Sequence, residues 1–354
     1  MAMPHGYPGP ARPMRPGSPE TTSRGLLRYG NVRSVSSVEA DPATTQRIDR
    51  PGAAWIAMVV VYVVWGSTYL GNKIVIVHVP PLLTGGFRFL VGGIAMTVLL
   101  LVWRGPSAFR LTRAQFLTCA LTGLLLPAWG NGLVTLGQQN VSSGLAALLI
   151  ASVPLWIVLL RRMTGDRPRP ATFLGVAIGI VGLAVLLLAG SSAGSAGTSG
   201  NAWWGPWVVL LAGLGWAVGT FAATKMATPT NPLTLVAVQM TIGGVILLAV
   251  GFGKGDRLDV GSLPAATWWA WAYMALIASC LGFSAFAYTL NRLPVSTVAT
   301  YAYVNPVIAV LLGVVVAGER FSPLQVVGGL VVVAAVVLVV AAERKPSVEA
   351  PPPT

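Results

Sequence analysis

Ten apolar segments, each about as long as a membrane-spanning helix, follow one another between residues 53 and 342. Each is a continuous run of about 17 to 25 residues, the length that an α-helix needs to cross the hydrocarbon core of a bilayer. A membrane β-barrel would instead show segments of about ten residues with alternating polarity. The pattern predicts helices at Ala53–Gly71, Leu82–Val102, Phe116–Leu136, Ser142–Leu160, Ala171–Ala189, Pro206–Thr224, Leu233–Phe252, Thr267–Leu290, Pro294–Ala317 and Leu324–Ala342.

Short polar motifs precede three of these segments. Thr112 to Gln115 and Ser322 to Gln325 have the spacing of capping boxes, in which two side chains bind the free backbone N–H groups of a helix start. Asn231 followed by Pro232 offers a cap and a proline in the first turn. The motifs agree with the segment boundaries.

The composition excludes an ordinary water-soluble protein. Hydrophobic residues make up 55% of the chain and charged residues only 9%, against roughly a quarter charged in soluble domains. Such a chain cannot cover its surface with polar groups, so lipid must surround it. The formal net charge of +13 is typical of the basic cytoplasmic loops of membrane proteins, and we expect no nucleic-acid partner.

The distribution of basic residues predicts the orientation in the membrane. In the first half, the loops 137–141 and 190–201 contain no Lys or Arg, whereas the alternate loops and the N-terminal tail are basic. The basic residues on that side are Arg12, Arg15, Arg24, Arg28, Arg33, Arg47, Arg50, Arg104, Arg110, Arg113, Arg161, Arg162, Arg167 and Arg169. In the second half the count is nearly balanced, with Lys225, Arg292, Arg344 and Lys345 on that side and Lys254, Arg257 and Arg320 on the other. The positive-inside rule then places both termini in the cytoplasm, in a multi-pass protein of the plasma membrane.

The two halves of the chain repeat each other at an offset of about 152 residues. Ser67–Lys73 aligns with Gly219–Lys225, and Pro154 aligns with Pro306. Because each half holds five segments, the second half must enter the membrane from the opposite side. Inverted repeats of this kind are typical of secondary transporters, whose binding site lies near the bilayer midplane between the halves.

The repeat also defines the expected domains. They are a disordered, Arg- and Pro-rich cytoplasmic tail (1–52), a first five-helix repeat (53–189), a Gly/Ser linker (190–201), a second five-helix repeat (202–342) and a cytoplasmic C-terminal tail (343–354).

Arg88 is the only arginine well inside an apolar segment. A charge within lipid is costly and marks a functional candidate, and the guanidinium fork suits a carboxylate or phosphate. Alternatively, Arg88 lies about 9 Å from the helix start, close enough to snorkel to the outer surface as an anchor. Its repeat partner is Gln239, so a charge in this place is not duplicated. For Lys73 and Lys225, at repeat-related helix ends, we favour anchoring.

Aromatic, amide, hydroxyl and proline residues within the segments predict a central cavity. A proline in mid-helix frees a backbone carbonyl that a cavity can use, although interfacial belts and helix packing explain many Trp, Tyr, Ser and Thr residues equally well. The full set of cavity candidates is Trp65, Ser67, Thr68, Tyr69, Arg88, Trp129, Asn131, Pro154, Trp156, Trp216, Thr220, Tyr288, Tyr301, Tyr303, Asn305 and Pro306.

The segments contain no Asp or Glu, so they hold no buried carboxylate relay for protons. Coupling to protons, which we leave open, would need the substrate itself, Glu319 or His78 as the carrier. For Asp166 and Glu319 we favour a structural role, in which each acid interacts with the N-terminus of the next helix. The missing counter-charges disfavour polyamine-like dications and leave neutral, zwitterionic and anionic solutes open.

Several motifs together resemble the EamA-type branch of the drug/metabolite transporter superfamily. They are Trp65–Thr68, Phe87–Phe89, Ser143–Leu155 and Tyr301–Gly313 with Gly318–Glu319. The resemblance implies two inverted five-helix repeats around a central cavity lined by the first, third, fourth, sixth, eighth and ninth segments. It also implies alternating access for small metabolites such as amino acids and drugs. The chain departs from the family pattern at Gly165-Asp166, where the family has Gly-Glu.

We therefore predict an exporter rather than an enzyme, with no cofactor and no metal. The chain has no nucleotide-binding Gly-x-x-x-x-Gly-Lys loop for an ATP-driven pump. The acidic pair Asp256 and Asp259 is too small a ligand set for metal-assisted chemistry. A channel and a non-transporting scaffold are the alternatives, and the sequence leaves the substrate and the oligomeric state open.

Overall fold

The computed structural model describes residues 51–165, 168–190, 203–290, 292–293 and 295–342. The predicted tails beyond residues 51–52, the linker beyond Gly190 and Asp166 lie outside the described residues. The described residues form helices and short connections, without a β-strand. The predicted all-α membrane fold of two five-helix repeats is confirmed.

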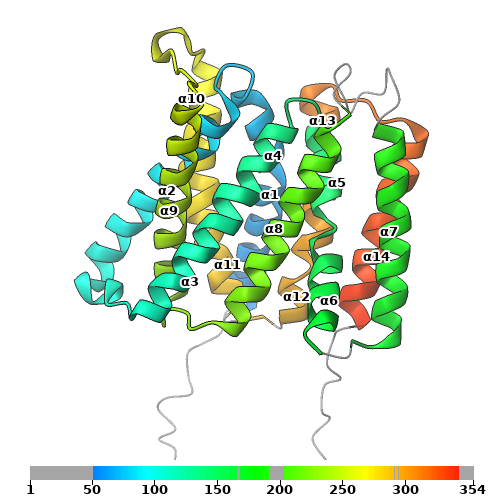
Figure 1. Cartoon of the computed structure of the whole chain (residues 1–354), viewed down its shortest axis with the longest axis horizontal. Helices are drawn as coiled ribbons and strands as arrows, with labels where there is room; N and C mark the ends of the chain where they lie inside the picture. Colours follow the sequence, from blue (N-terminus) through cyan, green and yellow to red (C-terminus); the bar gives the residue numbers. More distant parts are fainter. Residues whose placement is uncertain (1–50, 166–167, 191–202, 291, 294, 343–354) are drawn as a thin grey trace, which may run out of the picture. The chain divides into compact units, whose positions relative to one another are not determined.

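Six of the ten membrane segments are single continuous helices (Figure 1). They are α1 (Pro51–Val75), α2 (Pro81–Arg104), α7 (Pro170–Gly190), α8 (Gly205–Lys225), α9 (Pro232–Gly253) and α14 (Pro323–Ala342). Within the described part of the chain, nine segments are long and apolar enough to cross a membrane, and the tenth ends in a shorter apolar helix.

The other four segments are interrupted. The third comprises α3 (Arg113–Gly123), η3 (Leu124–Asn131) and α4 (Gly132–Gly137), and the fourth comprises α5 (Ser143–Ile150) and α6 (Val153–Met163). The eighth comprises α10 (Ala265–Ala272), η5 (Tyr273–Leu281) and α11 (Gly282–Leu290), and the ninth comprises α12 (Val295–Val298) and α13 (Tyr301–Ala317). η3 and η5 are π-helices, a rare form that is frequent at functional sites. Two one-turn helices, η2 (Pro106–Phe109) and η4 (Val260–Ser262), lie in connections.

The ninth segment differs from its predicted continuous helix at Pro294–Ala317. A turn at residues 299–300 separates α12 from α13, which leaves α13 with 17 residues. The Thr300 hydroxyl bonds the carbonyl of Thr297 and also meets the hydroxyl of Tyr62 on α1. Hydroxyl side chains that bond nearby carbonyls offer the backbone an alternative to the regular helix ladder, and this bond lies at the break.

The predicted helix caps are confirmed. Thr112 and Gln115 exchange the two bonds of a capping box at the start of α3, at 3.2 and 3.0 Å. Ser322 and Gln325 repeat the arrangement before α14, at 2.9 and 3.2 Å. The Asn231 amide oxygen accepts the N–H of Leu233 at 3.0 Å, with Pro232 in the first turn of α9.

Repeat-equivalent helices pack against each other. The second and seventh segments, α2 and α9, pair along their length, and so do the fifth and tenth, α7 and α14, which lie side by side in Figure 1. Glycines allow the close approach of α2 and α9: a Cβ at Gly93 would lie 2.7 Å from the backbone N of Thr241. Each half thus meets the other through matching elements, as an inverted repeat requires.

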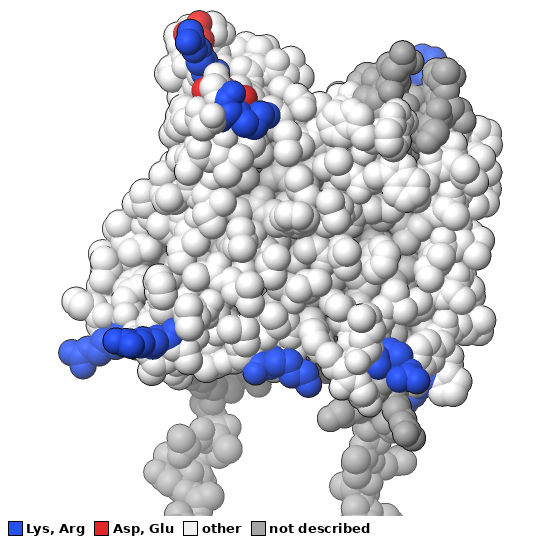
Figure 2. All heavy atoms as spheres, viewed as in Figure 1, with Lys and Arg blue, Asp and Glu red and all other residues white. Residues whose placement is uncertain are grey.

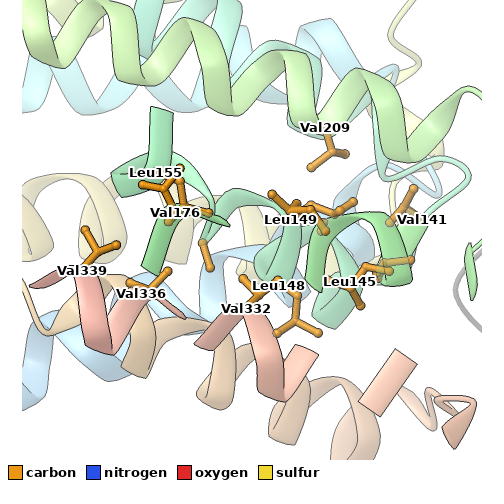
Figure 3. Packing of buried hydrophobic residues seen from close by; sticks show 14 of the residues in the cluster. Val141, Leu145, Leu148, Leu149, Leu155, Val176, Val209, Val332, Val336 and Val339 are labelled. Carbon is orange, nitrogen blue, oxygen red and sulfur yellow. The ribbon is translucent and has the colours of Figure 1, made fainter. Parts of the chain in front are cut away.

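The largest buried apolar cluster lies among α5, α6, α7, α8 and α14 (Figure 3). Val209 reaches it from α8, Leu145 and Leu149 from α5, and Val332 and Val336 from α14. Many large apolar residues outside the clusters remain exposed, including Val102 at 75% and Trp269 at 76%. Apolar surface on this scale faces lipid in a membrane protein.

Charged side chains gather at the two ends of the helices. In the described part of the face that Figure 2 shows, Lys and Arg lie at both edges, whereas Asp and Glu appear at one edge only. The acids at that edge, Asp256 and Asp259, lie in the connection from α9 to α10. The belt between the two edges on this face carries neither kind, and a bilayer would cover it.

Candidate functional site

A cavity of about 180 Å³ lies between the two halves, far larger than the roughly 10–15 Å³ that one water needs. Its walls come from both repeats. The predicted residues that line it are Trp65, Thr68, Tyr69, Arg88, Asn131, Pro154, Trp216, Tyr301, Asn305 and Pro306.

Two predicted residues on the first and third segments lie away from this cavity. The Ser67 hydroxyl lies 2.6 Å from that of Tyr273 and donates to the carbonyl of Val64. Trp129 is 41% exposed, and its indole N–H donates to the carbonyl of Leu211 on α8 at 3.0 Å. Both side chains join neighbouring helices.

The remaining four predicted residues also lie outside the lining of the cavity. Trp156 donates to the Ser152 hydroxyl at 3.1 Å, and Tyr303 packs against the large apolar cluster. Tyr288 stacks under the guanidinium of Arg292, 4.0 Å from the ring centre. Thr220 is half-buried on α8.

Two helices that the resemblance did not include also line the cavity. α2 contributes Arg88 and Phe89, and α9 contributes Gln239 and Met240. The two helices reach the cavity because their tight pairing brings them against η3 and α4. Eight of the ten segments, all but α7 and α14, therefore reach the cavity within the described residues.

Arg88 points inward rather than to the surface. Its side chain is 6% exposed, and one terminal nitrogen donates to the Asn72 amide oxygen at 3.5 Å. The guanidinium lies 4.9 Å from the ring centre of Phe89. A snorkelling anchor would expose the charge, so the geometry favours the alternative of a charge at the cavity.

Two amides that line the cavity are absent from the predicted set. Asn72 is 3% exposed and Gln239 is 5% exposed. The helical period could have predicted Asn72, because it lies seven, four and three residues after Trp65, Thr68 and Tyr69 and therefore on the same face of α1. Ser67 lies off that face, which explains why it points elsewhere.

Aromatic rings form one wall of the cavity. Trp65 on α1 meets Phe283 on α11 at 5.0 Å between ring centres and Tyr301 on α13 at 5.4 Å. Phe286 closes the group, 5.6 Å from Tyr301. Edge-to-face aromatic pairs of this kind present a rigid apolar surface.

Irregular backbone surrounds the same cavity. Pro127 lies inside η3, Pro154 begins α6 after a break, and Pro306 lies inside α13. A proline removes one helix hydrogen bond and leaves a carbonyl free. Non-helical backbone at membrane depth is tolerated where it lines a cavity, so these prolines support the cavity as a binding site.

The hydrogen bonds of Glu319 go to a helix of the other repeat, and not to the helix that follows it as predicted. Its carboxylate oxygens accept the N–H groups of Ser143 and Gly144 at 2.6 and 3.1 Å. Ser143 and Gly144 are the first residues of α5. Gly318, at φ +64°, ends α13 in a left-handed turn just before Glu319. The acid thus caps a helix of the other repeat.

His78 is exposed, with one ring nitrogen 3.1 Å from the Thr267 hydroxyl. Across the residues that the structure describes, His, Cys, Asp and Glu form no group of three that could hold a metal ion.

Known proteins of similar sequence are membrane transporters. The model of the EamA-like transporter family matches residues 52–188 and again residues 203–341. The chain is 36% identical over 271 residues to the uncharacterized inner membrane transporter YedA of Escherichia coli strain K12, covering 76% of this chain and 84% of YedA.

More distant relatives carry narrower names. A probable terminal-alkyne amino-acid exporter of Streptantibioticus cattleyicolor is 29% identical, with 78% of this chain and 89% of the exporter covered. The threonine/homoserine exporter RhtA of Salmonella typhimurium is 27% identical, with 65% and 73% covered. One solved crystal structure shares the fold with a TM-score of 0.56 at 19% identity, covering 83% of this chain and 99% of that one.

Proposed function

The chain belongs to the EamA-like transporter family, and from that premise we propose that it is a secondary active exporter of small metabolites that works by alternating access. Amino acids and related solutes are the proposed cargo, with drugs as a further class. The observation that carries the proposal is the cavity enclosed by helices of both repeats, with buried polar side chains in an otherwise apolar wall.

The export direction and the cargo rest on the relatives. Two of them are named as exporters of amino acids or of threonine and homoserine. Both termini lie in the cytoplasm in this proposal, because the basic residues concentrate at the ends of α2, α6 and α8.

The test is transport by purified protein in proteoliposomes. A pooled set of amino acids and small metabolites is offered with and without a pH gradient, and the solutes are read by mass spectrometry. Saturable movement of one solute class supports a carrier, and dependence on the gradient identifies proton coupling. Flux that does not saturate favours a channel. Folded protein that moves no solute favours a scaffold and contradicts the proposal.

A further inference from the structure

The cavity contains a buried positive charge without an anionic partner. One terminal nitrogen of Arg88 donates to two neutral groups, the Asn72 amide oxygen and the Met274 sulfur, and its Nε has no hydrogen-bond partner among the described residues. The described acids are Asp256, Asp259 and Glu319, and each lies in a connection between helices. A charge taken out of water needs a counter-charge, and the bound solute is the remaining source of one.

A second polar atom in the cavity also lacks a partner. The Asn305 amide oxygen is buried on α13 and accepts no hydrogen bond from a described residue. An unpaired buried acceptor is costly, so this oxygen offers a place for a hydrogen-bond donor of the solute. Asn305 is neutral, and it accepts from an ammonium or from a hydroxyl group alike.

The two groups are not repeated in the other half of the chain. At the offset of 152 between Pro154 and Pro306, Asn305 corresponds to Val153, and Gln239 lies 151 residues after Arg88. The cavity therefore presents one cation and one neutral acceptor to an asymmetric solute. In the same cavity, the indole and phenyl rings of Trp65 and Phe283 form an apolar wall for the body of the solute.

We infer that the cavity binds monocarboxylates that carry an apolar side chain and one adjacent donor group, so that 2-hydroxy acids are cargo as well as the corresponding amino acids. The inference rests on the proposed function. The carboxylate binds Arg88, which Asn72 orients, and the ammonium or hydroxyl group donates to Asn305. An amine without a carboxylate is rejected, because no described acid in the membrane segments would balance its charge.

The test uses matched probes in proteoliposomes. L-leucine and L-phenylalanine are each compared with the 2-hydroxy acid and the decarboxylated amine of the same carbon skeleton, in addition to the pooled solutes described above. Amino acid and hydroxy acid are expected to move with kcat/KM values within about tenfold of each other, since either donor satisfies a neutral acceptor with about one hydrogen bond. The amines are expected to move only at the rate of protein-free liposomes.

Variants assign the two ends of the solute. Arg88→Gln is expected to lower kcat/KM for both acids by about 10- to 100-fold, the value of a hydrogen bond to a charged group. Asn305→Asp is expected to keep transport of the amino acid, whose ammonium group balances the new negative charge, and to lose transport of the hydroxy acid, whose neutral hydroxyl group leaves that charge unbalanced. Arg113→Gln, at an exposed arginine that begins α3, is the matched control and is expected to change neither.

Four outcomes would overturn the inference. Transport of the amines at the rate of the amino acids would show that Arg88 does not bind the carboxylate. Absence of hydroxy-acid transport would show that Asn305 does not act as a neutral acceptor. Pooled solutes that move while every monocarboxylate probe fails would overturn the inference and leave the proposed function intact. Folded protein that moves no solute at all would overturn both.

Discussion

Lys73 and Glu319 hold the same short connection from its two ends. The Lys73 ammonium donates to the carbonyls of Gln138 and Val141 at 2.7 and 3.2 Å, where α4 ends. The Glu319 carboxylate accepts the backbone N–H groups at the start of α5. A cation on terminal carbonyls and an anion on initial N–H groups each complement the helix dipole they meet. The pair therefore ties α1 and α13 to the third and fourth segments.

Glu319→Ala is expected to lower the unfolding free energy by about 1–3 kcal/mol, because two N–H groups of α5 lose a charged acceptor. The measurement is thermal unfolding of the purified protein in detergent. Arg320→Ala is the control, since Arg320 is exposed beside Glu319. Equal midpoints for the two variants would contradict the capping role.

Lys73→Met is expected to lower the unfolding free energy by about 1.5–3 kcal/mol, the range for hydrogen bonds from a charged group. In the double variant with Glu319→Ala, the loss of unfolding free energy is expected to differ from the sum of the two single losses by at least about 0.5 kcal/mol, because both residues hold one connection. A double-mutant cycle of unfolding measures this coupling. Strict additivity would show that the two ends act independently.

Arg88→Met is expected to leave stability unchanged or raise it by about 1–3 kcal/mol, because a buried charge without an anionic partner is replaced by an apolar chain. Transport of monocarboxylates is expected to fall in the same variant. Unfolding midpoints and proteoliposome uptake are measured on one preparation. A loss of more than about 2 kcal/mol would instead assign Arg88 to the structure.

Gly244→Ala is expected to destabilise the protein by about 1–3 kcal/mol through overpacking. The added Cβ would lie 2.9 Å from the carbonyl oxygen of Gly86, on the closely packed α2. Gly253→Ala, in the same helix with no atom within 4 Å of the added Cβ, is expected to be neutral or to gain up to about 1 kcal/mol in helix propensity. Similar unfolding midpoints would argue against tight pairing of α2 and α9.

The proposed orientation is tested by cysteine labelling. Ser107→Cys and Ser262→Cys are placed in exposed connections at opposite ends of the helices, in a background with Cys119→Ala and Cys280→Ala. A membrane-impermeant maleimide on intact cells is expected to label position 262 and to spare position 107 until the cells are opened. The reverse pattern would place the termini outside.

The sequence predicted the membrane segments well, because the length and apolarity of a run decide whether it can cross lipid. It placed the ninth segment as one helix, whereas the structure has a break at Thr300, which contacts Tyr62 on α1. A contact across 238 residues leaves no mark in local periodicity.

Individual cavity residues were harder to predict than the fold. Residue type selected Trp65 and Asn305, which line the cavity. It also selected Trp129 and Trp156, whose N–H groups bond neighbouring backbone or hydroxyl groups instead. Which face of a helix meets the cavity depends on packing, and the pairing of α2 with α9 decides that Arg88 turns inward.

The two π-helices bear on the ancestry of the chain. At the offset of 152, η3 (Leu124–Asn131) falls on residues 276–283 and overlaps η5 (Tyr273–Leu281). Wide turns of this kind are rare in proteins, and two independent origins at one equivalent place would be a strong coincidence. The widened turn therefore belongs to the five-helix unit itself, and each copy carries it in its third segment.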